Sequence, residues 1–132
     1  PEVFPLGETV VTWTATDSSG NSASDTQKVL VEDTTSPIIT TPSDIQVEIS
    51  DNSGMKLNIG TSITEDIVDL QPEITNDAPE VFPLGETVVT WTATDSSGNS
   101  ASATQTITVV DTTSPVLIVP KPITIEAIQI AS

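Results

Sequence analysis

One segment of this chain occurs twice almost unchanged. Residues 1–26 recur as residues 79–104, a shift of 78 positions, with Asp25 replaced by Ala103 as the single difference. The shift continues into the acidic motif EDTTSP at 32–37, which returns as VDTTSP at 110–115. We therefore divide the chain into the back part of one unit (1–36), a complete unit (37–114) and the front part of another (115–132). The chain is expected to begin and end within units.

A complete unit of this size is small for a stable domain. Domains in this range usually gain stability from disulfides, a bound metal or neighbouring units. The sequence contains no cysteine, which excludes disulfides. A metal or neighbouring units are therefore the expected sources of extra stability.

The charge of the chain is strongly negative. Nineteen acidic residues face three lysines, giving a net charge of −16. Without a basic patch, nucleic acid and anionic membrane surfaces are poor partners. No apolar run reaches the roughly 18 residues of a membrane helix, so membrane insertion is not expected. Two interpretations of the acidic residues remain open, namely a hydrated surface or partial use as calcium ligands.

Apolar residues recur mainly with a period of two, as in half-buried strands. In 87–95, Val89, Trp91 and Ala93 alternate with polar or exposed positions, and 102–110, 45–49, 55–59 and 28–32 follow the same rule. Segment 63–70 is expected to be irregular, and 1–36 to be a three-stranded remnant. Six or seven short strands separated by turns predict an all-β, immunoglobulin-like antiparallel β-sandwich with Trp91 as core anchor.

The sequence resembles the hyalin-repeat (HYR) family of immunoglobulin-like domains. The resemblance rests on FPLGETVVTWTATDSSGN at 82–99, on the closing VVDTTSP at 109–115 and on the opening strands at 37–48. Where family members commonly carry cysteines, this chain has Thr40 and Trp91, with Trp13 in the first copy. The resemblance implies extracellular adhesion or scaffolding and no catalysis.

The residues themselves also argue against an enzyme. Histidine, cysteine, tyrosine and arginine are absent, which removes the usual bases, thiol nucleophiles and oxyanion clamps. The adjacent pair Glu65 and Asp66 is more typical of a hydrated turn or a metal ligand than of a glycosidase.

Three groups of residues are candidate calcium ligands. Asp95, Ser97 and Asn99 have the alternating spacing of oxygen ligands in a turning loop. The complete set comprises a loop motif in two copies (Asp17, Ser19, Asn21 and Asp95, Ser97, Asn99), the joints (Glu32, Asp33, Asp111) and a third group (Glu65, Asp66, Asp69). A hairpin turn explains the loop motif equally well, and a stiff linker explains the joint. Asp95 and Asp111 lie at opposite ends of one strand, so an ion is expected to be shared only across a joint, if the next unit's loops fold back.

The two ends of the chain have complementary defects. Segment 115–132 contains two apolar extended runs, while 1–36 has a core face around Trp13 without cover. We expect either that 115–132 is donated to 1–36 of another copy, giving a head-to-tail polymer, or that both belong to a longer tandem array. The preferred function is a structural subunit of an extracellular filament, pilus-like strand or surface layer, stiffened by calcium. The alternative is an adhesin stalk or binding module for a protein or carbohydrate. The composition favours a prokaryotic cell surface.

Overall fold

The computed structural model describes residues 3–128, which form eight strands and no helix. Within this range no helix is therefore long and apolar enough to cross a membrane. The strands are β1 (Gly7–Thr16), β2 (Ser22–Val31), β3 (Ile38–Thr40), β4 (Ile45–Glu48), β5 (Ile63–Glu65), β6 (Glu73–Asn76), β7 (Gly85–Thr94) and β8 (Ser100–Val110).

The duplicated sequence forms the same element twice, a long antiparallel hairpin. β1 pairs with β2 and β7 with β8, in registers that place Trp13 opposite Asp25 and Trp91 opposite Ala103. The second hairpin turns at residues 95–99, where Gly98 has a φ of 90° that a residue with a Cβ rarely adopts. The turn chemistry expected for this motif is thus confirmed.

The complete unit has two layers. A four-stranded sheet has the order β4-β8-β7-β6, and a two-stranded sheet of β3 and β5 packs through β3 against β7 and β8. This confirms the all-β, immunoglobulin-like sandwich. The sheet is not wholly antiparallel, because β4 runs parallel to β8.

The core of the unit lies between these layers. Phe82, Val89, Trp91, Ile107 and Val109 are each at most 4% exposed, which confirms Trp91 as the core anchor. Partly buried residues of β3, β4 and the following loop complete the cluster. Apolar burial of this kind is the main source of stability in a small sandwich.

A buried glutamine connects the core to the loops that cover it. Gln105 is fully buried, and its Oε1 accepts a hydrogen bond from Trp91 Nε1 at 3.1 Å. Its Nε2 donates to the carbonyl oxygens of Ser43 at 2.8 Å and Ile59 at 3.0 Å. One side chain therefore joins the hairpin to two separate segments of cover.

Three expectations for the strands were wrong. Residues 55–59 form no ladder beyond the bridge of Met55 to Phe82, and the Asn58 side chain accepts the Gly60 amide within the same segment. Segment 63–70 is not wholly irregular, since β5 pairs with β3 before the chain bends at Asp66. The described part of 1–36 contains two strands, not three.

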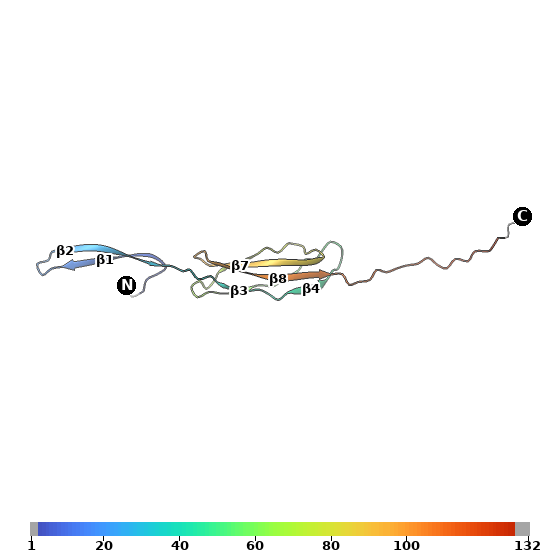
Figure 1. The fold of residues 1–132 in the computed structure, drawn as a ribbon, viewed down its shortest axis with the longest axis horizontal. Helices are drawn as coiled ribbons and strands as arrows, with labels where there is room; N and C mark the ends of the chain where they lie inside the picture. The colour runs from blue at the N-terminus through green and yellow to red at the C-terminus, as the bar shows by residue number, and fades with distance from the viewer. Residues whose placement is uncertain (1–2, 129–132) are drawn as a thin grey trace.

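The elements are strung along one axis, as Figure 1 shows. The β1–β2 hairpin lies at one end and the complete unit in the middle. Beyond β8 the chain leaves the unit as an extended segment whose described residues, 111–128, form no strand and are all exposed. Neither the tail nor any described strand covers the apolar face of the first hairpin, where Trp13 is 64% exposed.

Candidate metal centre

Three aspartates from separate segments meet at the joint between the first hairpin and the complete unit. Asp33 follows β2, Asp66 follows β5, and Asp95 follows β7. One carboxylate oxygen from each lies within 4.8 Å of the others. Asp95 is only 5% exposed, and Asp33 and Asp66 are half-buried. Each residue comes from a different one of the three predicted groups.

Local turns hold the carboxylates of Asp33 and Asp66 through one oxygen each, and the other oxygen of each carboxylate makes no hydrogen bond. Asp33 Oδ1 accepts the Thr35 amide at 3.0 Å, and Asp66 Oδ1 accepts the Val68 and Asp69 amides at 2.8 and 3.0 Å. The Oδ2 atoms of Asp33 and Asp66 are buried and have no hydrogen-bond partner among the described residues. A buried carboxylate oxygen without a partner is costly, so these two atoms call for a ligand.

The third carboxylate is held by its own hairpin turn. Asp95 Oδ1 accepts the amides of Ser97 at 2.9 Å and Asn99 at 2.8 Å, and Oδ2 accepts Asn99 Nδ2 at 2.9 Å. Burial raises the pKa of Asp95, but the hydrogen bonds from Asn99 and Ser97 outweigh burial and hold the pKa below its ordinary value. Asp95 therefore carries a negative charge at neutral pH.

The loop that carries Asp95 is also tied to both neighbouring segments. Asn99 Nδ2 donates to the Asp33 carbonyl oxygen at 2.9 Å, across the joint. On the other side, Asp69 Oδ2 accepts the Ser96 amide at 2.9 Å. The three carboxylates are thus positioned by hydrogen bonds that do not use the two free oxygens.

The donor set fits a hard divalent cation. Calcium prefers carboxylate and carbonyl oxygens, and three converging carboxylates would otherwise repel one another. Absence of nitrogen and sulfur donors from this cluster disfavours zinc. Asp33, Asp66 and Asp95 are therefore the residues that could hold calcium.

The remaining predicted ligands lie outside this cluster. Asp17 is exposed, and its carboxylate accepts hydrogen bonds from Ser19 and Asn21 in an isolated turn. Ser97 and Asn99 make the equivalent bonds to Asp95. The others are Glu32 and Glu65, which are exposed, Asp69, which caps the loop, and Asp111, which lies at the far end of β8.

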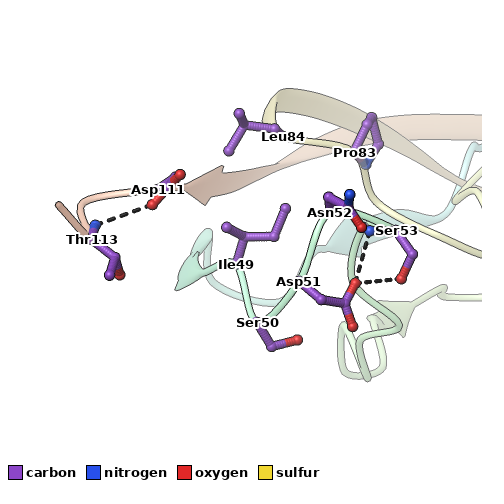
Figure 2. Close-up of a pocket in the computed structure, with 10 residues that line it drawn as sticks. Ile49, Ser50, Asp51, Asn52, Ser53, Pro83, Leu84, Asp111 and Thr113 are labelled. Carbon is purple, nitrogen blue, oxygen red and sulfur yellow. Dashed lines mark hydrogen bonds between the residues drawn. The ribbon is translucent and has the colours of Figure 1, made fainter. Parts of the chain in front are cut away.

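A groove of about 530 Å³ lies at that far end, beside Asp111 (Figure 2). Its lining includes Ile49, Leu84 and Thr113, whose amide donates to Asp111 Oδ1 at 3.1 Å. The positions equivalent to Leu84 and Asp111 in the first copy are Leu6 and Asp33, which line a smaller groove together with Ser97 of the complete unit. Leu84 and Asp111 thus occupy positions whose equivalents, in the first copy, lie beside the following unit.

Comparison with known proteins identifies relatives of this chain. Hyalin of Lytechinus variegatus is 44% identical over an alignment covering 90% of this chain and 24% of hyalin. Hyalin of Strongylocentrotus purpuratus is 39% identical over 99% of this chain and 12% of that protein. Sushi, von Willebrand factor type A, EGF and pentraxin domain-containing protein 1 of Rattus norvegicus is 42% identical over 76% of this chain and 3% of its own length.

These relatives are animal proteins, and they give no support to the expected prokaryotic source. The chain spans less than a quarter of each of them. No solved structure matches the chain. Residues 32–109 match the HYR domain. The match extends from the acidic joint to the end of β8, and the chain belongs to the HYR domain family.

Proposed function

We propose that this chain is a structural segment of an extracellular filament, pilus-like strand or surface layer. Its HYR units follow one another in a rod, by tandem linkage or by strand complementation between copies, and calcium stiffens the joints. The module is non-catalytic. One observation carries the proposal: carboxylates of two consecutive units converge at a joint and leave two buried oxygens without partners.

The geometry supports a role for the cation in stiffness because its ligands come from both sides of the joint. Asp33 belongs to the first unit, and Asp66 and Asp95 belong to the next. An ion bound to all three links the two units directly. Without it, mutual repulsion among the carboxylates favours separation of the units.

Calcium titration of the chain tests this proposal, with unfolding temperature as a second readout. Extracellular calcium modules bind with Kd values of about 10⁻⁴–10⁻³ M. A ligand at 100 times its Kd stabilises the folded state by about 2.7 kcal/mol. We expect saturable calcium binding by calorimetry and an increase in Tm that a chelator reverses.

The two copies provide a matched control. Asp33→Asn removes a ligand of the cluster. Asp111→Asn makes the same change in the second copy of the motif, which lies outside the cluster. In both copies the aspartate Oδ1 accepts the backbone amide two residues later, so the two substitutions are locally matched. Asp33→Asn should abolish the calcium-dependent rise in Tm, and without calcium should be at least as stable as wild type because one repelling charge is gone. Asp111→Asn should keep the response. Absence of binding by wild type at about 10 mM calcium, ten times the weak end of that Kd range, contradicts the proposal.

An adhesin stalk or binding module for a protein or carbohydrate is the second candidate. The groove beside Asp111 favours it, because it combines apolar Ile49 and Leu84 with polar groups. The equivalents of Leu84 and Asp111 in the first copy, Leu6 and Asp33, line a groove together with Ser97 of the following unit, which favours the rod. Leu84→Asp should weaken capture of a glycan or protein ligand if the groove is a binding site, and should leave such capture unchanged if it is a joint surface.

A further inference from the structure

The outer faces of the two sheets in the complete unit differ in composition. On β7 and β8 the outward positions are mostly threonines, such as Thr92 and Thr106, which is the polar outer face that a half-buried strand normally has. On the β3–β5 sheet, Ile39 packs against the core, so alternation turns Ile38 and Ile63 outward. Both isoleucines are at least 65% exposed. The β3–β5 sheet therefore presents an apolar outer face within the complete unit.

A groove of about 260 Å³ continues this face towards the loop that follows β5. Two isoleucines, two acidic residues and two hydroxyl residues line it, namely Ile38, Ile67, Glu65, Asp66, Thr35 and Ser36. The side chain of Ile67 is 83% exposed. Lysine and arginine combine an apolar stem with a cationic end, and such side chains pack their stems on apolar surface. A groove with isoleucines and carboxylates matches both parts of a basic side chain.

Glu65 gives this groove a negative charge that no lysine neutralises. Its side chain is exposed on the outward face of β5, and the residue lies opposite Ile38 in the ladder. Within residues 3–128 the ion pairs are formed by other glutamates. The neighbouring Asp66 carboxylate accepts amides of its own loop and belongs to the joint cluster. Glu65 is therefore the carboxylate available to an incoming cation.

β5 is also an open edge of its sheet. It pairs with β3 on one side, and no strand of the described residues pairs with its other side. An extended segment can add to such an edge through main-chain hydrogen bonds, and its alternate side chains then lie beside those of the edge strand. The outward residues Ile63 and Glu65 are two positions apart. A complementary segment thus carries an apolar and a basic residue at the same spacing.

We propose that the β3–β5 face binds an extended segment of another protein, in which a lysine or arginine lies two positions from an apolar residue. The basic side chain enters the groove between Ile38 and Ile67 with its cation at Glu65. The apolar residue packs on Ile63. The surface is separate from the groove beside Asp111, and the inference depends neither on a rod nor on an ion at the joint.

Charge favours a different protein over a second copy of this chain. The chain has a net charge of −16, and two of its three lysines already form ion pairs with its own glutamates. Two copies joined through this face would bring like-charged surfaces together, which is unfavourable. A basic partner is attracted by the same charge, and its binding should weaken as salt is added.

Amide NMR titration of the 132-residue chain with a capped heptapeptide, Thr-Val-Thr-Lys-Thr-Val-Thr, tests the inference. Valines lie two positions from the lysine on both sides, so either strand direction presents the proposed pattern. A chelator keeps ions from the joint. We expect saturable shifts centred on Ile63, Glu65 and Ile67. The same peptide with glutamate in place of lysine should bind much more weakly, as should the isomer Val-Thr-Thr-Lys-Thr-Thr-Val, whose valines lie on the opposite face from the lysine.

Matched substitutions separate this surface from the general negative charge of the chain. Glu65→Gln should weaken binding about two- to fivefold, as expected for one exposed ion pair, and Glu86→Gln on the other sheet should have no effect. Ile67→Ser should weaken binding about tenfold through lost apolar contact, and Val88→Ser should not. All four side chains are exposed, so none of these substitutions removes a core contact. Leu84→Asp, at the other groove, should leave peptide binding unchanged.

Three results would overturn the inference. The first is the absence of saturable shifts with the lysine peptide up to about 1 mM. The second is equal weakening by Glu65→Gln and Glu86→Gln, which would mean attraction to net charge alone. The third is binding that is lost in Asp33→Asn but kept in Glu65→Gln, which would place the cation in the joint cluster.

Phosphatidylcholine vesicles test the other class of partner for an apolar face. The chain should not bind them. Vesicle binding that is lost in Ile67→Ser, without binding of the lysine peptide, would assign the face to a lipid surface and overturn the inference. Because the peptide titration contains no calcium, its outcome is independent of whether the joint binds an ion.

Discussion

The two tryptophans show that local sequence sets a residue's direction but not its burial. Trp13 and Trp91 occupy the same register in the same hairpin, and each donates Nε1 to a glutamine on the partner strand. Their exposures nevertheless differ, because only one hairpin has β3 and β4 against it. A residue's contribution to stability follows from that cover.

Replacing each tryptophan by alanine should have very different costs. Trp91→Ala should lower the free energy of unfolding by about 3–5 kcal/mol, because it removes a large buried side chain. Trp13→Ala should change it by no more than about 0.5 kcal/mol at concentrations where the chain is monomeric, since the side chain is largely hydrated. Urea titration measures both changes from the midpoint at constant m. Similar losses for the two variants contradict this account.

Substitution of the buried polar residue Gln105 should also lower the free energy of unfolding. Gln105→Leu leaves Trp91 Nε1 and the carbonyl oxygens of Ser43 and Ile59 without partners inside the core. Each such group costs about 1–3 kcal/mol, so a total loss above about 2 kcal/mol is expected in the same urea assay. Gln27→Leu is the control and should have a small effect, because Gln27 is exposed and makes one such bond.

At the residue scale the sequence predicts which side chains face the core better than it predicts their hydrogen-bond partners. The period of two placed Gln105 on the same face as Ile107 and Val109, and all three are buried. Nothing in the alternation indicates that its amide reaches two carbonyls more than forty residues away in sequence. Those partners come from loops whose positions depend on tertiary packing.

At the scale of elements, the end of β4 fixes the start of the second joint. Glu48 Oε1 accepts the Thr112 amide at 2.6 Å, Oε2 accepts Thr112 Oγ1 at 2.8 Å, and Thr113 Oγ1 donates to Oε1 at 3.2 Å. The Thr112 amide, followed by the two hydroxyls, holds the pKa of Glu48 below its ordinary value of 4.5. One carboxylate thus joins a strand to the segment that follows β8.

This clamp should make stability depend on pH in the acid range. A lowered folded-state pKa means that ionised Glu48 contributes stability above pH 4.5 and loses it as the pH falls through the folded-state pKa. The difference in unfolding free energy between wild type and Glu48→Gln should therefore be largest near neutral pH and shrink on acidification. Glu86→Gln, an exposed control, should differ little from wild type at any pH. A gap that stays constant below pH 4.5 contradicts the clamp.

Alanine substitutions at two glycines distinguish the cost of backbone strain from the cost of a steric clash. Gly54 and Gly98 both have positive φ, but an added Cβ at Gly54 would lie 2.6 Å from Val81 Cγ1 and 2.9 Å from the Phe82 carbonyl oxygen. Nothing lies within 4 Å of the same position at Gly98. Gly98→Ala should cost about 1–2 kcal/mol from strain, and Gly54→Ala about 1–3 kcal/mol more. Thermal unfolding compares the two variants, and Gly54→Ala should have the lower Tm. Equal Tm values would show that the loop at Gly54 moves to accommodate the added Cβ without cost.

The long strands and the short strand β4 could be predicted from sequence, whereas β5 and β6 could not. β7 and β8 have ten or more residues of alternation bounded by turn motifs, and both were expected within two residues of their ends. Residues 55–59 alternate equally well, yet form a loop, because Met55, Leu57 and Ile59 reach the core without a ladder. Alternation reports which side chains face inward and not whether the backbone pairs.

At the scale of the whole molecule, the arrangement of the joint was the feature that the sequence predicted least well. Asp33, Asp66 and Asp95 were each predicted as ligands, but in three separate groups, and the idea of sharing across a joint named only the loop and the linker. Asp66 lies close to Asp33 and Asp95 because β3, which directly follows the linker, pairs with β5. The turn that follows β5 therefore lies beside the loop at Asp95. That proximity depends on β3–β5 pairing, which was not predicted.

The proposed ion implies that calcium controls the flexibility of the rod. Spin labels at Asp25→Cys on β2 and Lys56→Cys in the complete unit report the distance across the joint, and the chain has no cysteine of its own. Calcium should narrow the distance distribution across the joint. A chelator should broaden it, because three like charges then face one another at the hinge.

A second label pair isolates the joint from the domain. Lys56→Cys with Ser102→Cys lies within the complete unit, whose core does not depend on the cluster, so its distribution should be the same with and without calcium. Asp33→Asn should make the pair across the joint insensitive to calcium, while Asp111→Asn should leave its response intact. If calcium leaves the distribution across the joint unchanged, the stiffness of the rod comes from its protein contacts, such as the bond from Asn99 to the Asp33 carbonyl, and not from an ion.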